Sequence, residues 1–553
     1  MSTPAHERRT VGRLTGIAYE HPGAFWFGVT AVTAGVLLML PFFFSSRHNQ
    51  YHLVGKSPDA AMWIGMVLSM AGIAATAYGL IPRLSEVSRG AVSRIRVRAL
   101  DDAPIQPAHV GLLLVMAAAV TIDVMKPTTL AFVVPGMAAE YGLRSPLNPT
   151  AAVPVAWLPL AGITGTVLGS FLWGWFGDRI GRRASILLAA VLFIATSACG
   201  SMPNYTWNFA TCFIMGLGVG GMLPITFALM AETIPARHRG WMIVLIGGDV
   251  AGAYIITSAL ASSIGAPTHL GWRILWLLGL PTGILLVLLN RWIPESPRFL
   301  LAHGRDAEAR EVMERYGAHV VEDAEASDLA VEERVRGRFA QLLSGPFGGL
   351  SLVLLFLGIG IGMVQFGFQQ WIPSNLQKLG FTSVDASRIL RDSALIGFPL
   401  NFPIAYLYGF WSSKKTIMLM AALTAAALFG FVIAGNSVAT NKPLLYGLLI
   451  VPIWGISSLT AVAVAYASEV YPTRIRSRGT GLAAGATKFG GVLILAIVVA
   501  KIAFPSISLT ALYGAIPLIL AIAALMVFGV ETRKKQLEQI TAEELKEVIP
   551  AAR

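Results

Sequence analysis

Fourteen apolar stretches of about 20 residues each constrain the fold of this chain more than any other feature. An α-helix rises 1.5 Å per residue, so about 20 apolar residues are needed to cross roughly 30 Å of hydrocarbon. The composition agrees, because 55% of the 553 residues are hydrophobic and only 13% are charged. We therefore predict an all-α polytopic membrane protein with spans at about 24–45, 60–82, 108–135, 152–175, 184–201, 207–231, 241–264, 272–293, 347–372, 392–411, 415–435, 443–468, 479–504 and 508–530.

Basic residues fall in alternate loops between these stretches, as the positive-inside rule requires of cytoplasmic loops. Membrane orientation therefore explains the net charge of +12, and we expect no nucleic-acid partner. Residues 1–22 are polar and lack a small-residue cleavage site, so we expect no signal peptide. We predict a multi-pass protein of the cytoplasmic (inner) membrane with both termini in the cytoplasm. The basic loop residues are Arg83, Arg89, Arg94, Arg96, Arg98, Arg179, Arg182, Arg183, Arg237, Arg239, Lys414, Lys415, Arg474, Arg476 and Arg478.

A repeated motif divides the core into two groups of six spans. Glu232-Thr233-Ile234-Pro235 recurs as Glu469-Val470-Tyr471-Pro472, at an offset of 469 − 232 = 237 residues. Duplicated halves of this kind are common in secondary transporters. We predict a tail with an extra two-helix hairpin and a basic loop (1–106), a first six-helix half (107–293), a cytoplasmic helical linker (294–346), a second half (347–530) and a cytoplasmic tail (531–553).

The loop after the second core span reads Gly174-Trp175-Phe176-Gly177-Asp178-Arg179-Ile180-Gly181-Arg182-Arg183. Its glycines permit a tight turn, and Asp178 can accept hydrogen bonds at an exposed helix N-terminus or from an arginine. The loop resembles the signature loop of the major facilitator superfamily; an ordinary charged turn is the alternative. The resemblance implies a cytoplasmic gate made of Gly174, Gly177, Asp178, Arg179, Gly181, Arg182, Arg183, Glu232, Arg239, Glu469 and Arg478.

Shorter motifs narrow the resemblance. Residues 294–300 and 531–538 resemble the sugar-porter and metabolite-transporter branches, and residues 218–225 look most like synaptic-vesicle-type metabolite:proton symporters. Sugar porters typically follow a Gln-Gln pair with Ser-Gly-Asn, whereas here Gln369-Gln370 leads directly into Trp371, which disfavours a hexose substrate. The fifth core span lacks the Gly-Pro pair of drug:proton antiporters, so efflux becomes the second interpretation.

Charged residues inside the spans are candidates for coupling, because a charge at the bilayer centre costs at least ~2.5 kcal/mol. Asp123 and Lys126 lie one turn apart near the middle of the first core span, where they form either a proton-coupling pair or a static buried pair. Asp249 is either a further proton site or a helix-packing group. Lys488 either binds an anionic substrate or extends to the interface.

By resemblance, the first, fourth, seventh and tenth core helices line a central cavity. This nominates as substrate-binding residues Lys126, Gln365, Gln369, Gln370, Trp454 and Lys488. Gln365 and Gln369 share a helix face at i, i+4, as a hydrogen-bonding wall requires. Isolated Gln and Trp residues also serve as interhelical contacts or interfacial anchors, and that alternative stays open.

The sequence shows no phosphate-binding loop, no nucleophile–base set and no metal-ligand spacing, so we expect no enzyme activity, no cofactor and no metal. We predict a secondary active transporter that moves a small organic metabolite by alternating access with proton symport. The predicted substrates include anionic metabolites. The alternatives are proton-driven efflux and a transporter-like receptor that does not move solute. The N-terminal hairpin is the expected surface for a protein partner or for self-association.

Overall fold

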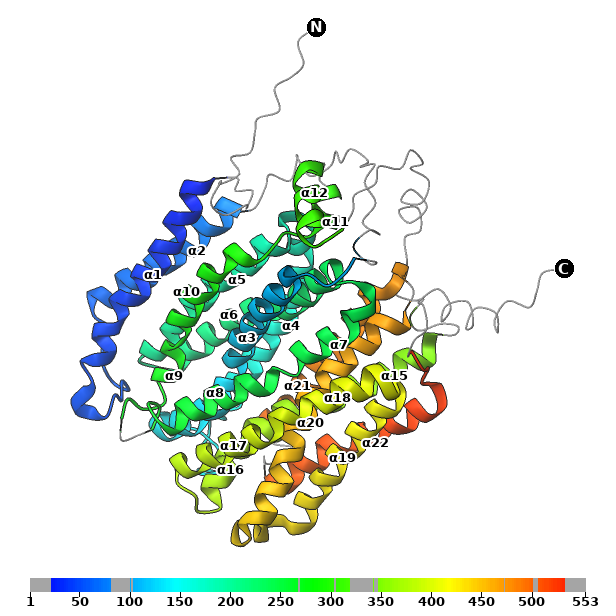
Figure 1. The fold of residues 1–553 in the computed structure, drawn as a ribbon. Helices are drawn as coiled ribbons and strands as arrows, with labels where there is room; N and C mark the ends of the chain where they lie inside the picture. The colour runs from blue at the N-terminus through cyan, green and yellow to red at the C-terminus, as the bar shows by residue number, and fades with distance from the viewer. Residues whose placement is uncertain are drawn as a thin grey trace, which may run out of the picture. The chain divides into compact units, whose positions relative to one another are not determined.

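The computed structural model describes the chain as helices joined by short loops (Figure 1). Within the described residues, the only β-type pairings are two isolated bridges, Arg144 with Pro154 and Ser145 with Asn148. The predicted all-α class is therefore confirmed. The described residues are 21–80, 100, 103–266, 269–302, 305–318, 342, 347–471, 473–500 and 506–532.

The helices follow the predicted order along the chain. Up to the linker they are α1 (Pro22–Phe44), α2 (Ala60–Leu80), α3 (Pro107–Tyr141), α4 (Trp157–Ile180), α5 (Arg182–Thr196), α6 (Tyr205–Thr233), α7 (Ala236–Gly247), α8 (Val250–Ser262), α9 (Ile274–Leu277), α10 (Gly279–Leu289), α11 (Pro297–Ala302) and α12 (Asp306–Arg315). After the linker they are α15 (Phe347–Met363), α16 (Gln370–Lys378), α17 (Ser383–Gly397), α18 (Asn401–Tyr406), α19 (Ser413–Ala434), α20 (Lys442–Val470), α21 (Thr473–Val499) and α22 (Ile507–Phe528).

Twelve helices in the described part of the chain are long and apolar enough to cross a membrane. Two predicted spans differ from the rest. The stretch 152–175 yields α4, whose apolar part is the shorter segment Trp157–Trp173. The stretch 392–411 is divided among α17, α18 and short turns, because Pro399 and Pro403 interrupt regular hydrogen bonding there. The count of fourteen spans thus stays a prediction.

The helices pack into two compact units, each assembled from separate stretches of sequence. One unit contains residues 1–123, 168–236 and 273–323, and the other contains residues 124–167, 237–272 and 324–553. Since the boundary falls within α3, packing does not follow the chain order of the predicted halves. The division into 107–293 and 347–530 therefore remains a prediction from the repeated motif.

The N-terminal hairpin forms as predicted, and it packs within the first unit. Gly28 and Gly72 allow α1 and α2 to approach so closely that a Cβ added at Gly28 would lie 2.6 Å from the Gly72 carbonyl oxygen. Val32 and Val36 of α1 then pack against Ile194 of α5, and α1 and α2 lie beside α5 and α10 in Figure 1. One face of the hairpin is thus covered by its own chain, and a partner surface on it stays a prediction.

The predicted linker is described only in part. It contains α11 and α12, and α12 is anchored at its end by Tyr316, whose ring packs edge-on against His109 at the start of α3, with the ring centroids 4.9 Å apart. Residues 319–341 of the linker, the N-terminal tail to residue 20 and the C-terminal tail from residue 533 lie outside the described residues.

Candidate functional site

Asp123 and Lys126 lie near the middle of the 35-residue helix α3, as predicted. Asp123 is completely buried and Lys126 is 5% exposed. Pro127 follows the pair directly and cannot donate a backbone hydrogen bond to the turn that contains Asp123. Burial of two ionisable groups in a span is the arrangement expected of a coupling site, and the coupling role itself stays a prediction.

Asp249 lies at a break between two helices. The predicted continuous span 241–264 is interrupted at Gly248 and Asp249, where α7 ends and α8 begins. A neighbouring side chain bridges this break, because Asn401 Nδ2 donates to the Gly248 carbonyl at 3.4 Å and Asn401 Oδ1 accepts from Ser458 Oγ at 2.8 Å. The turn lies inside the single membrane-spanning segment Trp241–Ser262, so α7 and α8 belong to one span.

Two predicted glutamines, Gln365 and Gln369, lie in a π-helical turn, Val364–Gln369, between α15 and α16, and Gln370 begins α16. Such turns inside helices are frequent at functional sites. Gln369 Nε2 donates to the Pro452 carbonyl of α20 at 3.3 Å, so the turn contacts α20 two residues before Trp454. Gln369, Gln370 and Trp454 are buried, whereas Gln365 is half-buried. The structure thus brings together the helices that carry these predicted residues.

Several buried polar atoms on these helices lack a hydrogen-bond partner among the described residues. They are Gln370 Nε2, Trp371 Nε1, Ser374 Oγ and Trp454 Nε1. Gln370 and Ser374 share one face of α16 at i, i+4. A buried donor without a partner costs ~1–3 kcal/mol, so each of these atoms is a candidate contact for a ligand or a water molecule. Trp371 and Ser374 were not predicted, because burial and missing partners cannot be recognised in a sequence.

For the remaining predicted residues, the structure describes the side chains of only some. Lys488 is half-buried in α21. Gly174 lies within α4, and Gly177 is buried there. The side chains of Asp178, Arg179, Arg239 and Arg478 lie outside the described residues, so the Asp178 latch stays a prediction.

Arg182 and Glu232 of the predicted gate belong to a hydrogen-bonded cluster at the start of α5. Glu295, which follows the span that includes α10, accepts hydrogen bonds from the backbone N–H groups of Arg182 at 2.8 Å and Arg183 at 3.4 Å. Arg182 also pairs with Glu232 at 3.3 Å, and the Ser296 hydroxyl donates to the other Glu232 oxygen. Gly181 has φ +96°, a left-handed conformation that favours glycine.

Burial raises the pKa of Glu295, while the backbone N–H groups of Ser296, Arg182 and Arg183 and the Arg182 guanidinium oppose that rise. Gly181, the residue before α5, has no side chain that could cap the helix. The Glu295 carboxyl group caps the N-terminus of α5 in its place.

A second cluster has the same design at the start of α19. Glu531 accepts from the Ser413 backbone N–H at 3.0 Å and from the Ser413 hydroxyl at 2.8 Å. Glu469 accepts from Thr532 Oγ1 at 2.7 Å and from Tyr408 OH at 2.8 Å. Burial raises the pKa of Glu469, and the hydrogen bonds from Thr532 and Tyr408 partly offset this.

The two clusters share three corresponding positions. Glu295 and Glu531 each cap a helix, at an offset of 531 − 295 = 236, and the hydroxyls of Ser296 and Thr532 donate to Glu232 and Glu469. This agrees with the repeat recognised from Glu232 and Glu469. Residues 294–300 and 531–538 resemble transporter motifs, but no roles were predicted for Glu295, Ser296, Glu531 and Thr532; their common spacing was the available signal.

Among the described residues, no group of three or more His, Cys, Asp or Glu side chains is arranged to hold a metal ion.

Helices of membrane-spanning length, with ionisable side chains buried inside one of them, define a multi-pass membrane protein. The chain belongs to the Sugar (and other) transporter family, which it matches over residues 130–543. It is therefore a transporter of the major facilitator superfamily, as the sequence predicted.

Curated relatives resemble this chain over most of its length. The niacin transporter NiaP of Acinetobacter baylyi is 28% identical over 454 residues, which cover 80% of this chain and 99% of that relative. The 4-hydroxybenzoate transporter PcaK of Pseudomonas aeruginosa is 26% identical over 426 residues, which cover 74% and 90%.

A solved structure supports the fold. The xylose transporter XylE from E. coli, in a partially occluded inward-open conformation, matches with a TM-score of 0.62 at 16% identity, over 78% of this chain and 100% of XylE.

Proposed function

We propose that this protein imports a small aromatic carboxylate together with a proton, by alternating access across the bacterial inner membrane. The relatives named for niacin and 4-hydroxybenzoate motivate the substrate class, because both compounds combine one aromatic ring with one carboxyl group. Proton coupling rests on the buried Asp123 and Lys126.

The unpartnered donors of α16 and α20 carry the proposal. Gln370 Nε2, Trp371 Nε1 and Trp454 Nε1 are N–H groups, and an indole N–H can only donate. A ligand that satisfies them must present acceptors, and a carboxylate offers two oxygens with about four acceptor positions. Aromatic rings in the same region suit an aromatic substrate.

Matched ligands test this proposal. Nicotinate and nicotinamide have the same ring but differ in charge, as do 4-hydroxybenzoate and 4-hydroxybenzamide. We expect the acids to raise the melting temperature of the purified full-length protein, because a ligand at 100 times its Kd stabilises the folded state by about 2.7 kcal/mol. The amides should raise it less, because they lack the second acceptor oxygen and the charge.

Uptake completes the test. The radiolabelled acid that stabilises the protein should accumulate in proteoliposomes under an inwardly directed proton gradient. Stabilisation by the amides alone, or by neither pair, would contradict the proposed substrate class.

A further inference from the structure

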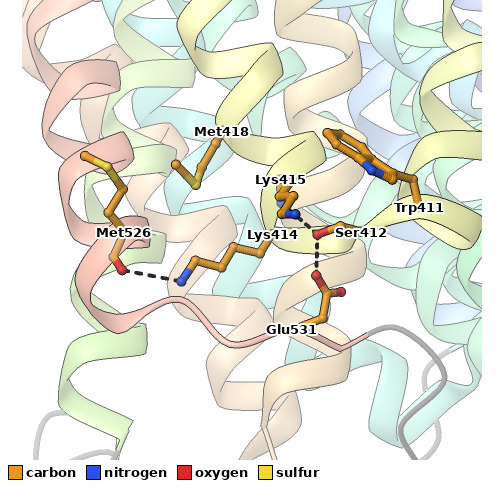
Figure 2. Close-up of a pocket in the computed structure, with 7 residues that line it drawn as sticks. All are labelled: Trp411, Ser412, Lys414, Lys415, Met418, Met526 and Glu531. Carbon is orange, nitrogen blue, oxygen red and sulfur yellow. Dashed lines mark hydrogen bonds between the residues drawn. The ribbon is translucent and has the colours of Figure 1, made fainter.

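A hollow of about 760 Å³ lies at one end of α19 and α22. Figure 2 shows its lining, which consists of Trp411, Ser412, Lys414, Lys415, Met418, Met526 and Glu531. We call it the Lys414 hollow. The membrane-spanning segments Ser413–Thr440 and Ile507–Phe528 begin and end here, so the hollow lies at the boundary between bilayer and water.

Two ammonium groups give the hollow its positive charge. Lys414 Nζ donates to the carbonyls of Gly529 at 2.9 Å and Met526 at 3.4 Å, which fixes it at the C-terminus of α22. An ammonium has three N–H donors, so these two bonds leave one for a ligand. Lys415 Nζ lies 5.8 Å from the centroid of the Trp411 ring, within reach of the same space.

The acidic residue in the lining does not cancel this charge. Glu531 directs its carboxylate to the hydroxyl of Ser412 and to the backbone and hydroxyl of Ser413, so its oxygens are occupied by donors from α19. Two lysines against one engaged carboxylate leave the hollow with a net positive charge.

Apolar side chains continue the hollow into the hydrocarbon region. Met418 and Met526 line it directly, and Met526 is 58% exposed. The adjacent Val527 is 73% exposed, which is the environment of a side chain that faces lipid. Trp411 supplies the amphipathic ring that is typical of the headgroup level.

We propose that the Lys414 hollow binds the phosphate of an anionic glycerophospholipid from the surrounding bilayer, with the acyl chains along Met526 and Val527. Basic pockets between helices at the membrane surface bind such headgroups. A soluble anion would use the lysines but not the apolar wall, which is why a lipid fits the whole surface. By the positive-inside rule, we expect this end to face the cytoplasmic leaflet.

Native mass spectrometry of the full-length protein, equilibrated with equal amounts of phosphatidylglycerol and phosphatidylcholine, tests the proposal. The wild type should retain phosphatidylglycerol preferentially. Lys414→Gln with Lys415→Gln should reduce that preference about 25-fold, because each lysine at an anionic surface contributes roughly fivefold. The pair Lys414→Arg and Lys415→Arg should retain it, and so should the matched control Lys442→Gln at the opposite end of the same helical hairpin. An unchanged preference in the glutamine pair would overturn the proposal.

A second measurement does not depend on how the lysine variants fold. Trp411 fluorescence, taken as the difference between the wild type and Trp411→Phe, should be quenched more by brominated phosphatidylglycerol than by brominated phosphatidylcholine. Equal quenching by the two lipids would overturn the proposal. Excess inorganic phosphate should leave phosphatidylglycerol bound; displacement of the lipid by phosphate would show a site for soluble anions instead.

Discussion

At the scale of single residues, the proposed binding region contains polar groups that lower the stability of the ligand-free protein. Gln370 and Trp454 place N–H donors in a buried region where no described residue accepts from them. Satisfied polar groups would stabilise the fold, whereas these become favourable only when a ligand supplies acceptors. A binding role therefore predicts opposite effects on stability and on ligand response.

Gln370→Leu should separate these two effects. The substitution keeps a similar side-chain volume and removes the buried Nε2 atom that has no partner, so the ligand-free protein should become more stable by about 1 kcal/mol. The same change should remove most of the melting-temperature shift produced by the substrate. Thr424→Val is a matched control, because the Thr424 hydroxyl donates to its own helix at Met420. If Gln370→Leu keeps the full ligand shift, the amide is not a substrate contact.

The Glu295 carboxyl predicts a pH effect at the cap of α5. Burial raises its pKa above 4.5, so the folded state holds a proton that the unfolded state has lost. Its contribution to stability is therefore complete below about pH 4.5 and is lost as the pH rises through the raised pKa. The amide of the variant Glu295→Gln does not titrate. As the pH rises above about 4.5, the melting temperature of this variant should therefore fall less than that of the wild type.

A second substitution checks the cap itself. Glu295→Ala removes the acceptor for the Arg182 and Arg183 N–H groups and should destabilise the protein by about 2 kcal/mol at low pH, where the wild-type contribution is complete. Parallel melting curves of the wild type and Glu295→Gln across pH would show that the carboxyl is not protonated in the folded state.

Sequence patterns identify charged residues inside spans, but they do not identify the hydrogen-bond partners of buried polar residues. Asp123 and Lys126 could be predicted because charge in an apolar run is visible directly. Ser374 and Trp371 look like ordinary helix residues, and their significance depends on the absence of a tertiary partner. Asn401 likewise gains its role only because folding places it between Gly248 and Ser458.

At the scale of helices, hydropathy predicts where the spans lie better than where they break. The span 443–468 corresponds to α20, which is continuous from Lys442 to Val470. The span 241–264 is broken at Gly248, although the glycine pair before Asp249 was a visible warning of weak helix propensity. A hydropathy average does not register such a break, since glycine interrupts a helix without lowering its apolar character.

Because α1 and α2 pack closely, a larger side chain at Gly28 should strongly lower the stability of the protein. A Cβ there would lie 2.6 Å from two backbone atoms of α2, the Gly72 oxygen and the Thr76 nitrogen, which cannot move aside independently. Gly28→Leu should lower the melting temperature by an amount that corresponds to 1–3 kcal/mol, about the cost of overpacking. Gly23→Leu on the same helix is the control, because nothing lies within 4 Å of that position. Equal melting of the two variants would contradict the observed packing.

At the scale of the whole molecule, the chain repeats one design at the starts of α5 and α19. In each case a glutamate side chain from the segment after a later span caps the helix, and the hydroxyl of the next residue donates to a second glutamate. These bonds connect segments that are distant in sequence. Alternating access needs reversible contacts at a gate.

The repeat was recognised from sequence because Glu232 and Glu469 stand in similar motifs. The division into compact units was not predicted, because α3 contributes to both units and no sequence signal marks that boundary. The substrate is the property that is hardest to predict from the sequence, because it depends on which buried hydrogen-bond donors remain unsatisfied after folding.

Proton coupling through Asp123 is the central claim, and Asp123→Asn tests it most directly. The asparagine mimics the protonated carboxyl, so the variant should keep substrate binding and exchange but lose the response to a proton gradient. Lys126→Ala should be less stable than the double variant Asp123→Asn with Lys126→Ala, because the single change leaves a buried carboxylate without its counter-ion.

The deciding measurement is uptake of the stabilising aromatic acid into proteoliposomes, with an imposed pH gradient and, separately, by counterflow without one. We predict that Asp123→Asn exchanges substrate at a rate close to the wild type but shows at least tenfold less gradient-driven accumulation, a difference of ~1.4 kcal/mol or more in coupling. Accumulation at the wild-type level in Asp123→Asn would contradict the account and move the proton site to Asp249 or remove proton coupling altogether.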